Sequence, residues 1–162
     1  FALWLFSQTR AYNNNPIDGT EVDIIEIAKG APNYMNSSFN IAQHWGQAGT
    51  GSSESKQFNT GSTPKAIDFV NVNDDQYHTY GLLWTKTVMK CFVDGKLIYT
   101  FTENIPSDPI DMMLLLTLEF KLNAWDPKQG DGRISGPFVS EDEDIRVMSQ
   151  AEIDFVRVYK QE

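Results

Sequence analysis

Short apolar or alternating segments, separated by stretches rich in Gly, Pro, Asn and Ser, run along the whole chain. Short segments rich in Val, Ile, Tyr, Phe and Trp are typical of β-strands bounded by turns. The pattern predicts strands over residues 1–6, 19–26, 39–45, 66–70, 77–85, 88–93, 97–102, 112–119 and 153–159. No helical period of useful length and no internal repeat is present. We therefore predict an all-β fold, either a sandwich or a jelly roll.

Turn signals divide the predicted strands. Asp94-Gly95 indicates a two-residue hairpin, because Gly accepts a positive φ. Residues 46–55, rich in Gly and Ser, are predicted to be a mobile loop near the functional site. Residues 123–140, rich in Gly and Pro, are predicted to be a second loop. The strand at 112–119 is expected to be buried on both faces near its start.

The length of 162 residues and the hydrophobic fraction of 41% allow a substantial core, so residues 1–162 are expected to form one domain. Residues 1–6 are too apolar for a surface tail and are expected to form an interior strand. An interior strand without neighbours exposes ladder groups and apolar area. We therefore expect the fold to need N-terminal strands that these residues do not supply.

The net charge of −9 and the pI of about 4.6 exclude a nucleic-acid-binding role, because no basic stripe could meet phosphates. A neutral polymer is an easier ligand than a sulfated one for such a chain. The acidic run at residues 141–144 predicts a solvated loop, with a metal site as the alternative. The longest apolar run, residues 112–116, is too short to span a membrane, so no membrane partner is expected.

Cys91 is the single cysteine, which excludes an intrachain disulfide. It lies in an alternating strand pattern and is predicted to be a small buried hydrophobe.

The most unusual strand carries three carboxylates within six positions, Glu21, Asp23 and Glu26, separated only by Val and Ile. In a regular strand Glu21 and Asp23 share one face and Glu26 lies on the other. A β-bulge at Ile24–Ile25 would return Glu26 to the first face. The alternative is a half-solvated strand whose acids simply face water. Like charges on one face repel each other, which favours a functional role.

Two carboxylates on one face are what double-displacement glycoside hydrolysis needs. One attacks the anomeric carbon, and the other protonates the leaving oxygen. The proton donor must have a raised pKa, while the nucleophile must be ionised. Asp23, between Glu21 and Glu26, could influence both, so the three acids are expected to titrate as a coupled group.

Residues 21–26 resemble the bulged E-x-D-x-x-E signature of glycoside hydrolase family 16. Residues 1–5 are similar to the strand that precedes the signature in that family. Residues 77–84 and 92–96 are similar to its "FHTYGLEW…FYVDGK" region, and residues 153–159 resemble its "VDYVRVY" closing strand. The resemblance implies a concanavalin A-like jelly roll with a concave substrate cleft. It also implies Glu21 as nucleophile and Glu26 as general acid/base.

Aromatic and polar residues outside the signature are candidates for substrate contact, because aromatic rings cover the apolar faces of sugars. By resemblance, Trp4 and Trp125 lie near the cleft, and His44 points into it beside Trp45. Glu119 is a further candidate for substrate contact. Trp84 and His78 lie in strand patterns, for which core packing and a structural role are the alternatives.

Asp154 is similar to the calcium-binding aspartate of the family, which implies a structural Ca²⁺. Its co-ligands in the family come from the N-terminal segment, and a surface aspartate is the alternative. The chemistry itself requires no cofactor.

The resemblance implies a secreted, retaining endo-β-glycanase, monomeric when complete, with a polysaccharide as its partner. We expect β-1,3-glucan (laminarin) as substrate. The alternatives are a β-galactan substrate of the agarase, porphyranase or carrageenase type, a cell-wall transglycosylase, and a non-catalytic carbohydrate-binding protein.

Overall fold

The computed structural model describes residues 1–7, 15–18, 21–27, 38–45, 53–59, 76–108, 111–118 and 151–160. Within them the elements are β1 (Ala2–Phe6), η1 (Pro16–Asp18), β2 (Glu21–Glu26), β3 (Ser38–His44), β4 (Ser53–Asn59), β5 (Tyr80–Trp84), β6 (Met89–Val93), β7 (Lys96–Phe101) and β8 (Met113–Thr117). Apart from the single 3₁₀ turn η1, every regular element in these ranges is a strand. The predicted all-β class is confirmed, and no helix in the described part of the chain could cross a membrane.

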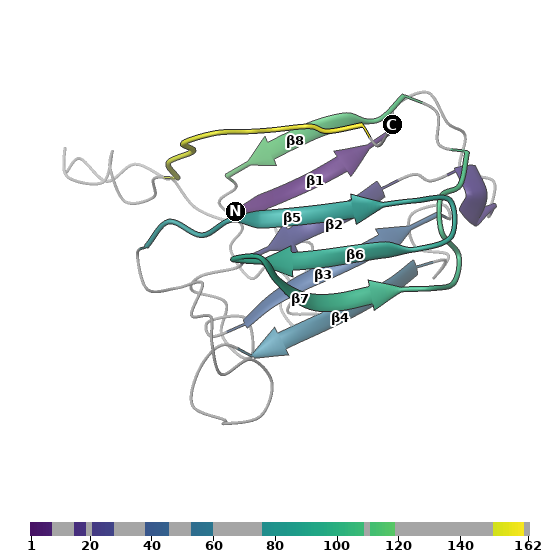
Figure 1. Cartoon of the computed structure of the whole chain (residues 1–162), viewed down its shortest axis with the longest axis horizontal. Coiled ribbons are helices and arrows are strands. Elements are labelled where there is room, and N and C mark those ends of the chain that lie inside the picture. Colours follow the sequence, from purple (N-terminus) through teal and green to yellow (C-terminus); the bar gives the residue numbers. More distant parts are fainter. Residues whose placement is uncertain are drawn as a thin grey trace, which may run out of the picture.

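The strands form two antiparallel sheets that lie one in front of the other (Figure 1). The five-stranded sheet has the order β4-β3-β2-β1-β8, and the three-stranded sheet has the order β5-β6-β7. β1 is an interior strand, as expected, because it pairs with β2 on one side and with β8 on the other. The predicted sandwich therefore places β2, with its three acids, in the middle of the larger sheet.

The core lies between the two sheets and is built from alternate residues of their strands. Its buried side chains come from both layers, Val22, Ile25, Phe39, Ile41, Met89, Cys91, Val93 and Phe101, and are joined by Ile105, which follows β7. Burial raises the pKa of the Cys91 thiol to about 12, so this group stays protonated and apolar in character. Cys91 is thus the buried hydrophobe that its strand pattern predicted.

The three-stranded sheet covers only part of the larger sheet. β5 packs against β2, and in Figure 1 β8 lies beyond the edge of the smaller sheet. Leu114 and Leu116 of β8 are consequently 36% and 38% exposed, although their neighbours Leu3 and Leu5 on β1 pack against the core. The prediction that this strand is buried on both faces near its start was wrong, because β8 is an edge strand that the smaller sheet does not cover.

The turn between β6 and β7 forms at the predicted Asp94-Gly95 pair, where both residues have positive φ, 50° and 74°. Asp94 also connects this turn to the chain before β5. Its backbone N–H donates to Thr79 O at 2.8 Å, and its Oδ1 accepts the Thr79 N–H at 2.9 Å. Its Oδ2 lies 2.9 Å from His78 Nδ1, which supports the structural role considered for His78.

β4 was not predicted as a strand, and its first three residues fall in the segment expected to be a loop. Its sequence, SESKQFN, has little apolar alternation. The strand forms because it pairs with β3 along its whole length, from Ser53 opposite His44 to Asn59 opposite Ser38. Tertiary pairing thus outweighs weak local propensity here. The predicted strand at 66–70 and the predicted loop at 123–140 lie outside the described residues.

Residues 151–160 are exposed and form no strand, so the predicted closing strand at 153–159 is wrong for this structure. A strand needs a neighbour to satisfy its ladder, and no strand in the described ranges pairs with this segment. One contact with the start of the β5 region is the hydrogen bond that Tyr77 OH donates to Glu152 Oε2. Val158 and Tyr159 are 87% and 80% exposed.

Candidate active site

β2 contains the predicted β-bulge. In its ladder with β3, Asp23 pairs with Ala42, whereas Glu26 pairs with Asn40. Three steps along β2 therefore match two steps along β3, and the ladder with β1 shifts at the same place. One extra residue is inserted between Asp23 and Glu26, which is the definition of a bulge.

The bulge decides which side chains of β2 face the core. Val22 and Ile25 are both 0% exposed and belong to the core cluster, although an unbulged strand would place them on opposite faces. Glu21, Asp23 and Glu26 consequently lie together on the face turned away from the core. We call this the acidic face of the five-stranded sheet.

Glu26 is held in a position that favours its protonated form. Its pKa is raised from 4.5 to about 7, with burial as the largest cause and the negative charge of Asp23 as the second. Asn40 Nδ2 donates to Glu26 Oε2 at 2.8 Å and opposes this rise, as does the charge of His44, while the charge of Glu21 adds to it. Near neutral pH, Glu26 therefore carries its proton for a large part of the time.

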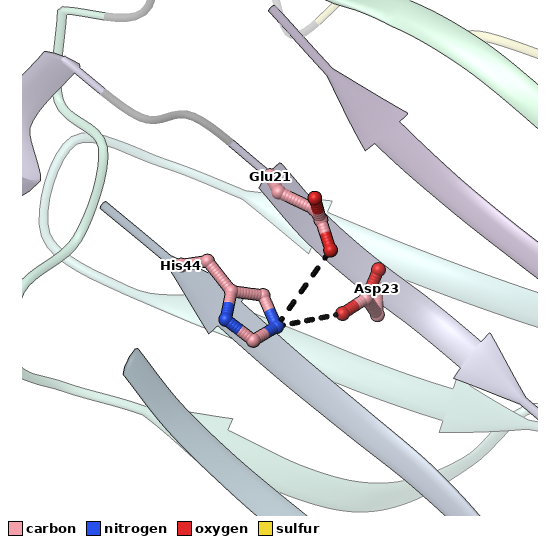
Figure 2. A group of neighbouring side chains, drawn as sticks. All are labelled: Glu21, Asp23 and His44. Carbon is pink, nitrogen blue, oxygen red and sulfur yellow. Dashed lines mark hydrogen bonds and ion pairs between the residues drawn. The ribbon is translucent and has the colours of Figure 1, made fainter. Parts of the chain in front are cut away.

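His44 ends β3 directly opposite Glu21 and reaches across to two of the acids. Its Nε2 lies 3.1 Å from Asp23 Oδ2 and 3.7 Å from Glu21 Oε1 (Figure 2). The hydrogen bond to Asp23 is the largest cause of a raised His44 pKa, which burial partly opposes. The imidazole therefore tends to be charged beside these acids.

Trp4 provides an aromatic surface next to the acids, because it pairs with Asp23 across the β1–β2 ladder. Its Nε1 donates to Thr117 Oγ1 of β8 at 3.2 Å, which fixes the orientation of the indole ring. The Phe6 ring lies 5.6 Å from the Trp4 ring, on the same side of β1. The structure thus places Trp4 beside the acids, and its contact with substrate stays a prediction.

The other candidate residues are distributed differently. Trp45 directly follows His44 at the end of β3 and is half-buried. Trp84 packs against the core, and its Nε1 donates to Pro106 O at 2.8 Å, which agrees with the core alternative. Trp125 and Glu119 lie outside the described residues.

Asn40 is a site residue that the sequence analysis missed. It shares a strand face with His44, because the two are four positions apart on β3 and side chains alternate with period two. Extending the alternation backwards from His44 would have identified it. Its contact with Glu26 depends on the register between β2 and β3, which the sequence alone does not show.

The calcium ion implied for Asp154 would need several oxygen ligands around that carboxylate. Asp154 lies in the exposed segment 151–160, and no group of three His, Cys, Asp or Glu side chains in the described ranges includes it. The calcium site stays a prediction.

Comparison with known proteins places the chain in a family. The model of glycosyl hydrolases family 16 matches residues 2–136. The glucan endo-1,3-beta-glucosidase A1 of Niallia circulans is 25% identical, over 99% of this chain and 22% of that protein. A beta-glucanase of Acetivibrio thermocellus is 29% identical, over 95% of this chain and 36% of that protein. Both are thus much longer than the matched chain.

A solved structure, the kappa-carrageenase of Pseudoalteromonas carrageenovora bound to an oligotetrasaccharide of kappa-carrageenan, is also similar. It has a TM-score of 0.36 and 19% identity, over 70% of this chain and 41% of that one. The match to the family model covers most of the chain, including β2 and its three acids. The chain therefore belongs to glycosyl hydrolases family 16.

Proposed function

We propose that this chain is the catalytic part of a retaining endo-β-glycanase, with Glu21 as nucleophile and Glu26 as general acid/base. The observation that carries this proposal is the bulge in β2, which brings both glutamates to one face of the sheet. The environment also separates their roles, since Glu26 retains a proton near neutral pH. Two acids whose environments favour opposite protonation states are typical of glycosidase sites.

In the proposed first step, the Glu21 carboxylate attacks the anomeric carbon while the bond from that carbon to the leaving oxygen breaks. The proton of Glu26 moves to the leaving oxygen, which departs as a hydroxyl group. The products are a covalent glycosyl ester on Glu21 and an ionised Glu26.

In the second step, Glu26 accepts a proton from water as the water oxygen attacks the anomeric carbon and releases Glu21. The Asp23–His44 pair supports both steps. Its hydrogen bond of 3.1 Å positions Asp23 between the two glutamates, where the charge of Asp23 raises the Glu26 pKa, and His44 Nε2 lies 3.7 Å from Glu21 Oε1. The reaction so described uses side chains alone and needs no cofactor.

β-1,3-Glucan is the substrate we propose. The support comes from the names of two relatives, a glucan endo-1,3-beta-glucosidase and a beta-glucanase. The net charge of −9 also favours a neutral polymer over a sulfated one. Since such polymers are too large to enter cells, we propose that the enzyme is secreted, and we propose a monomer.

The test is the release of reducing ends from laminarin, lichenan, agarose and carrageenan, with NMR of the first product to determine its anomeric configuration. We expect laminarin to be cleaved fastest and the β-configuration to be retained. Glu21→Gln keeps the shape of the side chain but cannot form the ester, so it should abolish hydrolysis while polysaccharide binding persists. Near-normal turnover by Glu21→Gln would overturn the assignment of the nucleophile.

The same substrate panel separates the alternatives. Preferred cleavage of agarose or carrageenan would indicate a β-galactanase. Transfer to added oligosaccharide in place of hydrolysis would indicate a transglycosylase. Binding of polysaccharide by a correctly folded protein, with no cleavage of any polymer, would indicate a non-catalytic binding protein.

A further inference from the structure

Three potential metal-binding atoms converge on the acidic face, from two neighbouring strands. They are Oε1 of Glu21, Oδ2 of Asp23 and Nε2 of His44, and they lie within 4.8 Å of one another. Figure 2 shows both carboxylates pointing toward the same imidazole nitrogen, which lies 3.1 Å from one and 3.7 Å from the other. The cross-strand pairing of Glu21 with His44 holds the two strands in this register.

These separations suit a small cation with nitrogen and oxygen ligands. Zn²⁺ bonds of about 2.0–2.2 Å in a tetrahedron place ligand atoms roughly 3.4 Å apart. The two measured separations bracket that value, so small side-chain movements would bring all three atoms into coordination. The imidazole makes the group better suited to Zn²⁺ than to Ca²⁺ or Mg²⁺, which prefer oxygen ligands.

The solvent exposure and the charge of these side chains also favour the binding of a cation. The side chains of His44 and Glu21 are 37% and 29% exposed, so an ion can enter from solvent and keep a water molecule as its fourth ligand. Asp23 is buried and fixed by the hydrogen bond to His44, so one ligand is already ordered. A divalent cation would also relieve the repulsion among the three carboxylates of this face.

We propose that Glu21, Asp23 and His44 form a Zn²⁺-binding site, and that the bound ion inhibits the enzyme by occupying the carboxylate of Glu21. The inhibition rests on the function proposed above, because it requires Glu21 to be the nucleophile. The binding of Zn²⁺ does not, since it follows from the three ligand atoms alone.

Binding is tested by calorimetric titration of the protein with ZnCl₂, and with CaCl₂ and MgCl₂ for comparison. We expect one Zn²⁺ per chain at this site and at least about tenfold weaker binding of the other ions. His44→Asn removes the nitrogen ligand and should weaken Zn²⁺ binding by about 100-fold or more, since loss of even an outer-shell partner costs about 10–100-fold.

The matched control is His78→Asn, which alters the other histidine of the chain. His78 also lies beside a carboxylate, 2.9 Å from Asp94, but in the described residues it belongs to no group of three ligands. We expect this variant to bind Zn²⁺ as the parent does. If His44→Asn fails to melt cooperatively, Glu21→Gln replaces it, because that change removes an oxygen ligand at a half-exposed position.

Activity assays in the presence of Zn²⁺ test the proposed metal site separately from the proposed glycanase function. In an active enzyme, Zn²⁺ should inhibit competitively with polysaccharide, EDTA should restore the rate, and residual activity of His44→Asn should be insensitive to the ion. Zn²⁺ binding that His44→Asn abolishes, in a protein that cleaves no polymer, would support the site and overturn the proposed function. Hydrolysis without Zn²⁺ binding, or binding unchanged in His44→Asn and Glu21→Gln, would overturn the inference.

Discussion

At the residue scale, the proton of Glu26 is the quantity on which the proposed chemistry depends. Burial and the charge of Asp23 raise its pKa to about 7, whereas the hydrogen bond from Asn40 acts in the opposite direction. The acid must be protonated when substrate binds. Activity should therefore fall as the pH rises above about 7.

Asn40→Ala removes the donor that stabilises the ionised form of Glu26. We expect the alkaline limb of kcat/KM to move to higher pH by about one unit, because a hydrogen bond to a charged group contributes about 1.5–3 kcal/mol. The measurement is a pH–rate profile of parent and variant on the same polysaccharide. A limb that stays in place or moves to lower pH would contradict the role given to Asn40.

The same shift in pKa makes a prediction about stability. Glu26 ionises near pH 4.5 in the unfolded chain and near pH 7 in the folded one, so the folded state binds more protons between these values. Its contribution to stability is fully present below about pH 4.5 and is lost as the pH rises to about 7. Glu26→Gln has no carboxyl group to ionise, so its stability should not fall in this way. As the pH rises through that range, its free energy of unfolding should increase relative to that of the parent by on the order of 3 kcal/mol.

Urea unfolding at pH 4.5 and pH 8 measures this difference. Parent and Glu26→Gln should differ more at pH 8 than at pH 4.5, with the variant more stable at the higher pH. A difference that does not depend on pH would show that Glu26 has an ordinary pKa.

At the element scale, the bulge of β2 keeps three acids on one face and two aliphatic residues in the core. Deleting Ile25 should leave a regular strand in which Val22 and one Ile still face the core and the acids still share the other face. We expect this variant to fold cooperatively and to retain measurable hydrolysis. Deleting Val22 is the matched control, because it turns Glu21 toward the core. This deletion should abolish both cooperative folding and hydrolysis.

The β6–β7 turn makes an independent prediction. Gly95 has a φ of 74°, which a residue with a Cβ adopts at a cost of about 1–2 kcal/mol, so Gly95→Ala should lower the free energy of unfolding by that amount. Gly81→Ala is the control, because the added Cβ would meet Phe92 Cβ at an ordinary 3.7 Å and no positive φ is involved. Equal effects of the two substitutions in urea unfolding would contradict the turn geometry.

At the scale of the whole molecule, the smaller sheet leaves part of the larger one uncovered. Apolar side chains of β8 and of residues 151–160 are exposed, among them Leu114, Leu116 and Phe155. Exposed apolar area of this kind drives dye binding and association. We expect the 162-residue chain to bind a hydrophobic dye such as ANS and to aggregate as its concentration rises.

The double substitution Leu114→Thr and Leu116→Thr keeps β-propensity and should reduce dye binding without lowering the far-UV signal. The prediction of exposed apolar surface would be contradicted if the parent bound no more dye than a compact protein of equal size. The expectation that the strand at residues 1–6 lacks neighbours within this chain was wrong, because β2 and β8 pair with its two sides.

The sequence alone could predict the features that depend on residues close together in the chain. The three acids of β2, the Asp94-Gly95 turn and most strands were predicted because each depends on a few adjacent residues. The motif also led to the family, and with it the prediction of a glycoside hydrolase is confirmed at the level of the family. The bulge itself was predictable, because only an extra residue reconciles the spacing of Glu21 and Glu26 with one shared face.

Only the tertiary structure decided which elements meet. Asn40 contacts Glu26 because of the register between β2 and β3, and β4 is a strand because β3 offers it a complete ladder. Conversely, residues 153–159 have strand-like sequence but no partner in the described residues, and β8 is apolar but lies at an edge. Pairing and burial depend on neighbours that are distant in the chain. The residues of a segment determine its propensity for a strand, whereas its neighbours decide whether that strand forms and which face is covered.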